Sequence, residues 1–123
     1  MQIVVGIVGP IGSGKSTTSA FLVKKGFVHL RFSEEIEKEI KKRNLEFSRK
    51  NYQDIGNEWR ARKVDFISRR ILKKIAKLPK ESKIVIEGCR NPGEIYPFKK
   101  LRNFYLIGLN APVEVRFQRV NKL

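Results

Sequence analysis

The feature that most constrains this chain is the octapeptide at residues 9–16, which reads G-P-I-G-S-G-K-S. This is the G-x-x-x-x-G-K-[ST] pattern of a phosphate-binding loop, or P-loop. Glycines let the backbone form a nest of inward-pointing N–H groups, a lysine reaches the β- and γ-phosphates, and a serine hydroxyl ligates Mg²⁺. We therefore expect this stretch to bind a polyphosphate through Gly9, Gly12, Ser13, Gly14, Lys15, Ser16 and Thr17.

The residues on either side of the loop support this prediction. The apolar run Ile3–Val8 predicts a strand that is buried on both faces. Residues 15–25 predict a helix that ends at Gly26, with Lys24 and Lys25 in its last turn. A strand, a glycine-rich loop and a helix N-terminus, in that order, place bound phosphates at the positive end of a helix dipole. The alternative is a glycine-rich turn with an accidental lysine, and this context makes it the weaker interpretation.

Length and composition predict one globular domain over residues 1–123. The chain is 41% hydrophobic, but no apolar run approaches the roughly 20 residues that cross a membrane. The N-terminal apolar run lacks the charged segment of a signal peptide. A single cysteine, Cys89, excludes an internal disulfide framework. We therefore expect a cytoplasmic protein with no membrane partner.

The net charge of +15 has more than one interpretation. Lysine and arginine are spread along the whole chain and do not form one run. This balance fits a protein that handles nucleotide phosphates, a nucleic-acid-binding protein, or a surface adapted to heat. The only histidine, His29, lies in a predicted strand and is interpreted as a packing residue without a functional role.

Strands and helices alternate along the rest of the chain. Further strands are predicted at residues 27–32, 83–87 and 103–109, and further helices at 33–43, 48–78, 92–101 and from Pro112 onward. Ser33 and Ser48 are the predicted N-caps. Gly56 weakens the first part of residues 48–78, so one long helix or two joined helices are both possible. This alternation predicts an α/β fold in which helices cover both faces of a parallel sheet. Ligands of such sheets bind beyond the carboxyl ends of the strands.

The helix at 33–43 has an acidic first turn and a basic last turn, as the helix dipole favours. We expect most of these charges to form a solvated face. The spacing predicts ion pairs four residues apart, namely Glu34–Lys38, Glu37–Lys41 and Glu39–Arg43.

Glu87 and Arg90 are the next candidates for a chemical role. An acidic residue that ends an apolar strand beside a P-loop can hold Mg²⁺, directly or through water, or position the attacking group. A guanidinium group three residues later suits a substrate phosphate, which it can bind through two parallel hydrogen bonds. An acidic strand end and a surface arginine without function remain the alternatives.

Three stretches together resemble the P-loop nucleoside monophosphate kinases. They are the P-loop, the E-G-C-R sequence at residues 87–90 and the closing A-P-V-E-V-R-F-Q-R at residues 111–119. The resemblance is narrower to the dephospho-CoA-kinase-like and deoxynucleotide-kinase-like branch, which has a segment similar to residues 51–60 between its second and third strands.

This resemblance implies a three-layer P-loop NTPase fold with four visible strands in the order 2-3-1-4. It implies ATP-dependent phosphoryl transfer, with Mg²⁺, to the phosphate or hydroxyl of a small nucleotide-like acceptor. The catalytic candidates are Lys15, Glu87 and Arg90, and the metal-binding candidates are Ser16 and Glu87. The acceptor-binding candidates are Arg31, Asn51, Gln53, Arg60 and Arg90.

The chain also departs from these kinases. They often carry Asp where Glu87 stands, and an arginine in the first turn of the second helix where this chain has Glu37. They continue into an arginine-bearing lid, so we expect the C-terminal part of the domain to be missing here and turnover to be poor, with Arg116 and Arg119 as partial substitutes. A nucleic-acid-directed P-loop enzyme and a nucleotide-binding module without turnover remain alternatives. A GTPase is disfavoured because no D-x-x-G sequence follows the P-loop.

Overall fold

The computed structural model describes residues 1–10 and 12–109. The predicted helix from Pro112 and the candidates Arg116 and Arg119 lie outside these ranges. The described part contains, in chain order, β1 (Ile3–Val8), α1 (Lys15–Lys24), β2 (Val28–Arg31), α2 (Phe32–Lys42), α3 (Arg49–Arg62), α4 (Phe66–Lys77), β3 (Lys83–Glu87), α5 (Pro92–Lys99) and β4 (Phe104–Gly108). None of the helices in this part is long and apolar enough to cross a membrane.

The four strands form one parallel sheet in the order β2-β3-β1-β4, which confirms the predicted fold class and strand order. β1 lies between β3 and β4, and the register sets Ile7 beside both Glu87 and Ile107. Because all strands run the same way, the P-loop after β1 and the loop after β3 leave the sheet at the same edge. The sheet therefore brings together the two motifs that are about 70 residues apart in the sequence.

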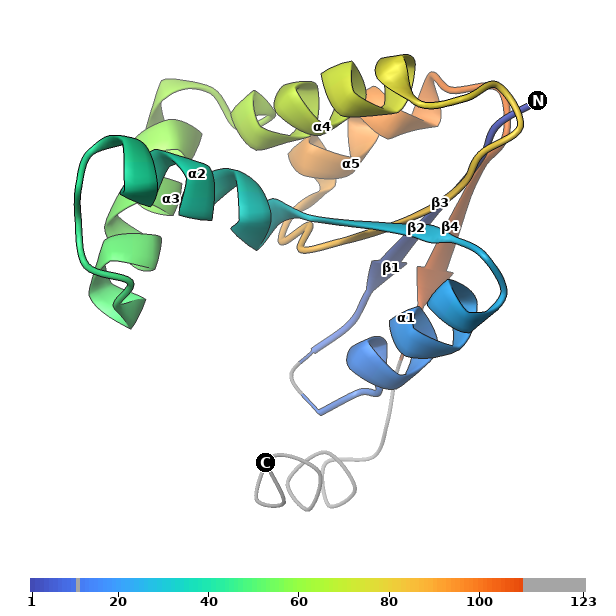
Figure 1. The fold of residues 1–123 in the computed structure, drawn as a ribbon, viewed down its shortest axis with the longest axis horizontal. Helices are drawn as coiled ribbons and strands as arrows, with labels where there is room; N and C mark the ends of the chain where they lie inside the picture. The colour runs from blue at the N-terminus through green and yellow to red at the C-terminus, as the bar shows by residue number, and fades with distance from the viewer. Residues whose placement is uncertain (11, 110–123) are drawn as a thin grey trace.

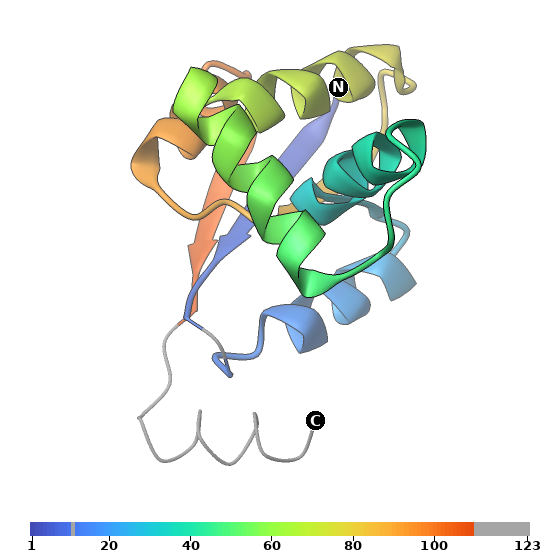
Figure 2. The same ribbon diagram turned by 90° about the vertical axis from the view of Figure 1, so that its left-hand side faces the viewer.

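Helices cover both faces of the sheet (Figures 1 and 2). α1 packs on the face that carries Val5, Ile7 and Val85, while α4 and α5 lie on the opposite face. Val4, Ile84 and Ile86 point to that second face and join the larger core cluster with α2, α3, α4 and α5. α2 and α3 extend beyond the carboxyl edge of the sheet (Figure 1), so they provide a second wall next to the P-loop.

Local sequence signals explain most of the element bounds. Ser48 caps α3 as predicted, because its hydroxyl accepts a hydrogen bond from the backbone N–H of Asn51 at 3.2 Å. The predicted N-cap at Ser33 is wrong. β2 passes directly into α2, whose first residue is the buried Phe32, so that Ser33 already lies inside the helix. Residues 48–78 form two helices, and the break falls at 63–65 rather than at Gly56.

The predicted solvated face of α2 is wrong at Glu35. This carboxylate is 2% exposed and lies between α2 and α4, where it pairs with Lys74, with Arg70 at 3.2 Å and with Lys38 at 3.4 Å. Tertiary packing also changes the other predicted pairs: Glu34 binds Arg31 and Glu37 accepts from Tyr52. Of the three predicted pairs, the structure shows only Glu39–Arg43, at 2.8 Å.

We expect Glu35→Gln to lower the free energy of unfolding at pH 7 by about 1–3 kcal/mol, because it leaves Lys38, Arg70 and Lys74 without their shared counter-charge. Burial raises the pKa of the Glu35 carboxyl, but the hydrogen bond and charge of Lys74, together with Lys38, outweigh it and hold the pKa below its ordinary 4.5. A depressed pKa adds stability above the ordinary value and loses it as pH falls. The difference between wild type and variant in urea unfolding should therefore shrink below about pH 4.5. Equal stability at pH 7 would contradict this role.

Candidate functional site

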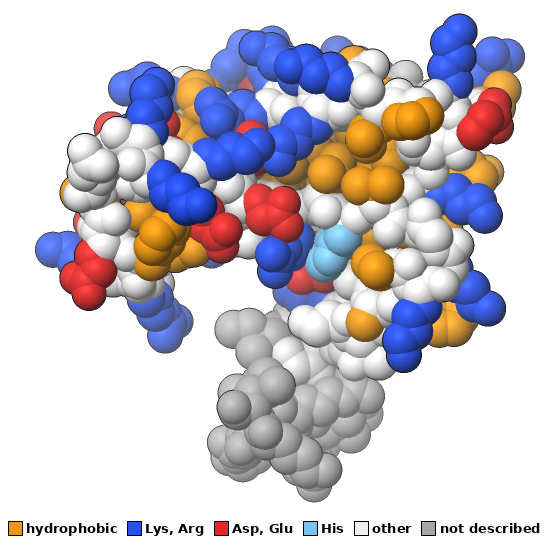
Figure 3. All heavy atoms as spheres, viewed as in Figure 1, with side chains coloured by type: hydrophobic (Ala, Val, Ile, Leu, Met, Phe, Trp, Pro, Cys, Tyr) orange, Lys and Arg blue, Asp and Glu red, His pale blue; other side chains and the backbone are white. Residues whose placement is uncertain are grey.

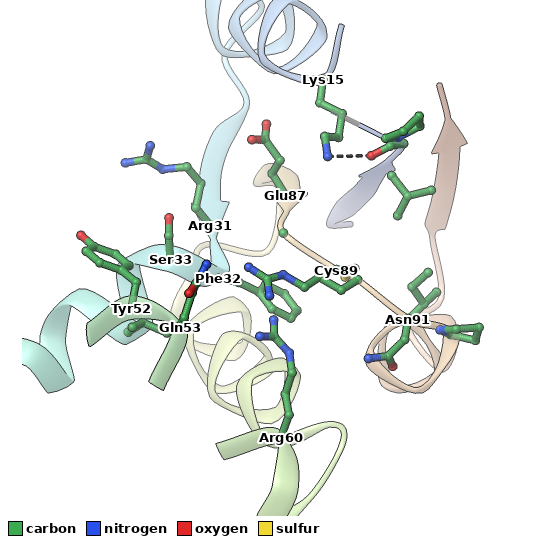
Figure 4. A pocket seen from close by; sticks show the side chains of 18 of the residues that line it. Lys15, Arg31, Phe32, Ser33, Tyr52, Gln53, Arg60, Glu87, Cys89 and Asn91 are labelled. Carbon is green, nitrogen blue, oxygen red and sulfur yellow. Dashed lines mark hydrogen bonds between the residues drawn. The ribbon is translucent and has the colours of Figure 1, made fainter. Parts of the chain in front are cut away.

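A cavity of about 840 Å³ opens at the carboxyl edge of the sheet, between the P-loop and the wall made by α2 and α3. Figure 4 shows the side chains that line it. They come from the ends of β1 and β3, from the P-loop, from α2 and α3, and from the start of α5. The charged and polar members are Lys15, Arg31, Ser33, Arg49, Tyr52, Gln53, Arg60, Glu87, Arg90 and Asn91.

The P-loop has the backbone shape that its glycines predict. Gly12 and Gly14 have φ angles of 79° and 100°, in the left-handed region that other residues rarely adopt. Lys15 begins α1, and its Nζ donates a hydrogen bond of 2.6 Å to the carbonyl oxygen of Gly9, across the mouth of the loop. The ammonium group therefore lies at the P-loop end of the cavity (Figure 4). To bind a phosphate it has only to exchange a carbonyl oxygen for a phosphate oxygen.

Two further features of the loop fit a polyphosphate. No side chain caps α1 at Gly14, and its first turn has no acidic residue, so the positive end of the helix dipole is open to an anion. The buried hydroxyl of Ser13 has no hydrogen-bond partner among the described residues.

Ser16 and Thr17 lie at the start of α1 and line a smaller hollow of about 490 Å³ with Phe21. The two hydroxyls are thus next to the loop but outside the main cavity.

Glu87 ends β3 and faces the main cavity opposite Lys15 (Figure 4). Two side chains that sequence reasoning missed lie against it. The buried Ser19 of α1 donates a hydrogen bond to Oε1 of Glu87, and Nε2 of His29 lies 3.5 Å from the same oxygen. His29, interpreted from the sequence as a packing residue, is thus a neighbour of a candidate catalytic group. The pairing of β2 with β3 creates this contact, so only knowledge of the strand order could have shown it.

Gly88 explains why a glycine follows this acid. Its φ is +118°, and a Cβ here would lie only 2.7 Å from Cβ of Phe32 at the start of α2. The chain can therefore turn away from β3 and pass close to α2 only with glycine at this position. This turn directs Cys89 and Arg90 along the cavity wall.

The structure brings together four of the five predicted acceptor-binding residues. Arg31, Gln53, Arg60 and Arg90 line the cavity, and Arg60 and Gln53 extend into it from α3 (Figure 4). Asn51 does not line it, because its amide group donates a hydrogen bond of 2.7 Å to the carbonyl oxygen of Glu46.

The arginines that line the cavity differ in whether they already pair with a carboxylate. Arg31 is paired with Glu34 at 2.9 Å, and this hydrogen bond raises the pKa of Arg31. Arg60 is 16% exposed and donates from Nε to the carboxylate of Glu94 at 2.9 Å. Within the described residues, Arg90 forms no side-chain ion pair.

Two further residues of α3 line the cavity although neither was among the predicted site residues. Arg49 and Tyr52 lie one helical turn apart and both line the cavity. The hydroxyl of Tyr52 donates to Glu37 at 2.8 Å, and its desolvation and this hydrogen bond raise its pKa. Trp59 of the same helix is 3% exposed and packs on Phe66, so it belongs to the core and not to a base-binding surface.

Cys89 lines the cavity but is not a nucleophile. Burial, reinforced by the charge of Glu94, raises the pKa of its thiol to about 12. The thiol is therefore protonated at neutral pH, whereas a reactive cysteine needs its thiolate form. The candidate chemistry of the cavity is that of Lys15, Glu87 and the arginines.

Within the described ranges, no cluster of three or more His, Cys, Asp or Glu side chains could hold a metal ion by itself. This agrees with the way Mg²⁺ binds beside nucleotides, through one or two protein oxygens, water and the phosphates of the substrate. Ser16 and Glu87 are the protein groups that would hold Mg²⁺, and the ion would neutralise phosphate charge.

Residues 5–123 match the model of a family described as AAA domain. The match begins in β1 and includes the P-loop, the loop after β3 and β4. The chain belongs to this AAA domain family. The family assignment and the loop geometry identify a P-loop NTPase-like, nucleotide-binding domain.

This AAA domain is similar to archaeal proteins whose names carry no function. It is 34% identical over 121 residues to the UPF0200/UPF0201 protein of Archaeoglobus fulgidus, a match that covers 95% of this chain and 38% of that protein. It is 32% identical over 125 residues to the UPF0200 protein of Methanosarcina mazei, with 99% of this chain and 66% of that protein covered. The chain thus spans less than two thirds of the length of both relatives.

A solved structure supports the fold. TT1252 from Thermus thermophilus aligns over 98% of this chain and 72% of its own, with a TM-score of 0.55 and 22% sequence identity. At this identity the likeness concerns the three-layer α/β architecture alone.

Proposed function

We propose that this AAA domain transfers the γ-phosphoryl group of ATP to a small phosphorylated or nucleotide-like acceptor. The observation that carries the proposal is the single cavity that runs from Lys15 of the P-loop to Arg60 of α3. An enzyme that only hydrolyses ATP needs room for a water molecule beyond the γ-phosphate. The cavity of about 840 Å³ is large enough for a nucleotide-sized molecule.

Each residue has a distinct role in this proposal. Lys15 binds the β- and γ-phosphates, and the first turn of α1 stabilises their negative charge. Glu87 faces the point of transfer, where it orients the attacking oxygen of the acceptor. Ser16 and Glu87 would hold Mg²⁺, which would supply positive charge beside the phosphates. The attacking oxygen forms a bond to the γ-phosphorus while the bond to the bridging oxygen breaks, so that ADP leaves and the acceptor proton passes to Glu87 or to water. Arg90 and Arg60 bind the charged part of the acceptor.

The acceptor class rests on the resemblance to dephospho-CoA-kinase-like and deoxynucleotide-kinase-like proteins. The E-G-C-R sequence of that resemblance lines the cavity beside the P-loop, because β3 pairs directly with β1, and this supports a role in contact with the acceptor. A cytoplasmic location would agree with the use of ATP and a nucleotide-like acceptor.

The net charge of +15 supports nucleic acid as a second candidate acceptor. On the face shown in Figure 3, lysine and arginine side chains gather over α4, away from the cavity. Binding there would be strongly salt-dependent, because it would release counterions from the phosphate backbone.

An acceptor panel tests the proposal. ADP release from ATP should rise when one of the deoxynucleoside monophosphates, ribonucleoside monophosphates or dephospho-CoA is added, and a single-stranded oligonucleotide should have no such effect. ATP binding with no stimulation by any small acceptor would contradict the proposal. Stimulation by the oligonucleotide alone, lost steeply with salt, would establish the second candidate.

A further inference from the structure

Glu94, in the first turn of α5, is a fully buried carboxylate that no predicted role uses. It is 0% exposed and joins three parts of the molecule. Its Oε2 accepts from Nε of Arg60 at 2.9 Å, and its Oε1 accepts from the backbone N–H of Arg90 at 2.8 Å. Its carbonyl oxygen accepts from the buried hydroxyl of Ser68 in α4 at 2.6 Å. Burying a carboxylate costs free energy, and the hydrogen bonds to its two oxygens compensate part of that cost. An apolar side chain would fill the same space without this cost, so the charge itself calls for an explanation.

The side chain of Arg60 is held from a second direction by a glycine. Gly56 lies one turn earlier on α3 and is buried. A methyl group at Gly56 would lie 3.0 Å from Nη1 of Arg60 and 3.4 Å from Cδ1 of Ile36. Glycine inside a helix is unfavourable compared with alanine, so its place here needs a reason. Glycine at this position therefore leaves room for Nη1 of Arg60, which a methyl group would press away by a few tenths of an ångström.

We propose that Glu94 and Gly56 are positioning residues that hold the guanidinium of Arg60 in the cavity as a binding group for a phosphate of the acceptor. Glu94 accepts the hydrogen bond of Nε–H of Arg60, and the absence of a side chain at Gly56 lets the guanidinium lie close to α3. The other N–H groups of Arg60 are then directed into the cavity that Arg60 lines. The inference rests on the proposed function for the identity of the bound molecule as an acceptor.

The charges around Arg60 favour an anion over a neutral group. Arg49 and Arg90 line the same wall, and neither has a carboxylate within ion-pair distance among the described residues. Glu94 accepts from the guanidinium of Arg60 and from the backbone N–H of Arg90, so its negative charge lies between two arginines that line the cavity. A guanidinium whose orientation is fixed before binding loses little entropy when a phosphate accepts two hydrogen bonds from it.

The first test measures the affinity for inorganic phosphate by calorimetry, with the P-loop filled by ADP. Glu94→Gln puts an amide N–H₂ against Nε–H of Arg60 or against the N–H of Arg90, so the guanidinium loses its orientation. We expect phosphate binding to weaken by about tenfold, and by about tenfold or more in Arg60→Ala, with ADP affinity changed less than about twofold. Glu58→Gln, which removes an exposed carboxylate from the same helix α3, serves as the matched control and should bind phosphate as wild type does.

The second test uses Gly56→Ala, whose methyl group would lie 3.0 Å from Nη1 of Arg60. Alanine favours the helix, so the melting temperature should stay the same or rise, while its methyl group displaces Arg60 and weakens phosphate binding by about threefold or more. If the region had a purely structural role, a Gly56→Ala variant with an unchanged or higher melting temperature would bind phosphate at least as well as wild type. Asn57→Ala, at the next and exposed position of α3, is the control.

The outcomes separate this inference from the proposed function. Phosphate binding that weakens in Arg60→Ala, Glu94→Gln and Gly56→Ala supports the inference, whether or not an acceptor is found. Wild-type phosphate affinity in Arg60→Ala, or in both Glu94→Gln and Gly56→Ala, would overturn it even if phosphoryl transfer is observed. Absence of transfer with any acceptor, together with intact phosphate binding, would overturn only the proposed function.

Discussion

Lys15→Ala should abolish ATP-dependent turnover and weaken ATP binding by about 10–100-fold. The side chain is the only cation of the described P-loop, and its Nζ already lies 2.6 Å from the carbonyl oxygen of Gly9, at the mouth of the loop. Its charge-assisted hydrogen bonds to the β- and γ-phosphates would be lost in the ground state. The bonds that strengthen as charge develops on the transferred group would also be lost, and we expect kcat to fall by about 100-fold or more.

The control for this variant is Lys41→Ala. Lys41 lies on the exposed part of α2, so its removal changes the net charge by the same amount without altering the loop. Calorimetry with an ATP analogue that cannot be hydrolysed, together with an ADP-release assay, measures both effects. Unchanged ATP affinity and turnover in Lys15→Ala would refute the P-loop assignment.

Glu87→Gln should leave ATP binding almost intact and lower kcat by about 100–1000-fold. The carboxylate is 20% exposed at the carboxyl end of β3, faces the cavity and accepts a hydrogen bond from Ser19, while Nε2 of His29 lies 3.5 Å away. The amide has nearly the same shape and can still accept from Ser19, so the fold should persist. It lacks the negative charge that holds Mg²⁺ through water and accepts a proton from the acceptor.

The comparison of kcat with ATP affinity makes this prediction specific. A general loss of structure would lower both quantities, whereas a charge that acts at the point of transfer lowers kcat alone. Glu81→Gln, an exposed carboxylate before the amino end of β3, is the matched control and should behave as wild type. A Glu87→Gln variant with wild-type kcat would remove Glu87 from the chemistry.

The sequence predicted β1 and β3 to the residue because both are buried on two faces and read as continuous apolar runs. The parallel sheet and its strand order followed from the alternation of elements and from the resemblance to P-loop kinases. The break between α3 and α4 at residues 63–65 contains neither glycine nor proline, so no local signal marked it. Gly56 carried such a signal, yet the helix continues through it.

Residues of the candidate site that belong to a sequence motif could be predicted. Contacts that arise only from tertiary packing could not. The backbone shape of the P-loop was predictable from its glycines, and the placement of Glu87 and Arg90 in the same cavity followed from their position after a buried strand. Glu94 has the sequence signature of an ordinary acidic residue in a first helical turn, and its partner Arg60 is 34 residues away. The same holds for His29 beside Glu87, which depends on the pairing of β2 with β3. These contacts exist only once the elements have packed.

The central claim is that the P-loop and the arginine-lined wall form one site for phosphoryl transfer to a small acceptor. The most direct measurement is the destination of the labelled γ-phosphate of ATP when the protein is incubated with the acceptor panel. We predict that the label appears on one small acceptor in the same amount as the ADP released, and that Lys15→Ala abolishes this transfer. Label found only as inorganic phosphate, in an amount that no acceptor changes, would contradict the claim.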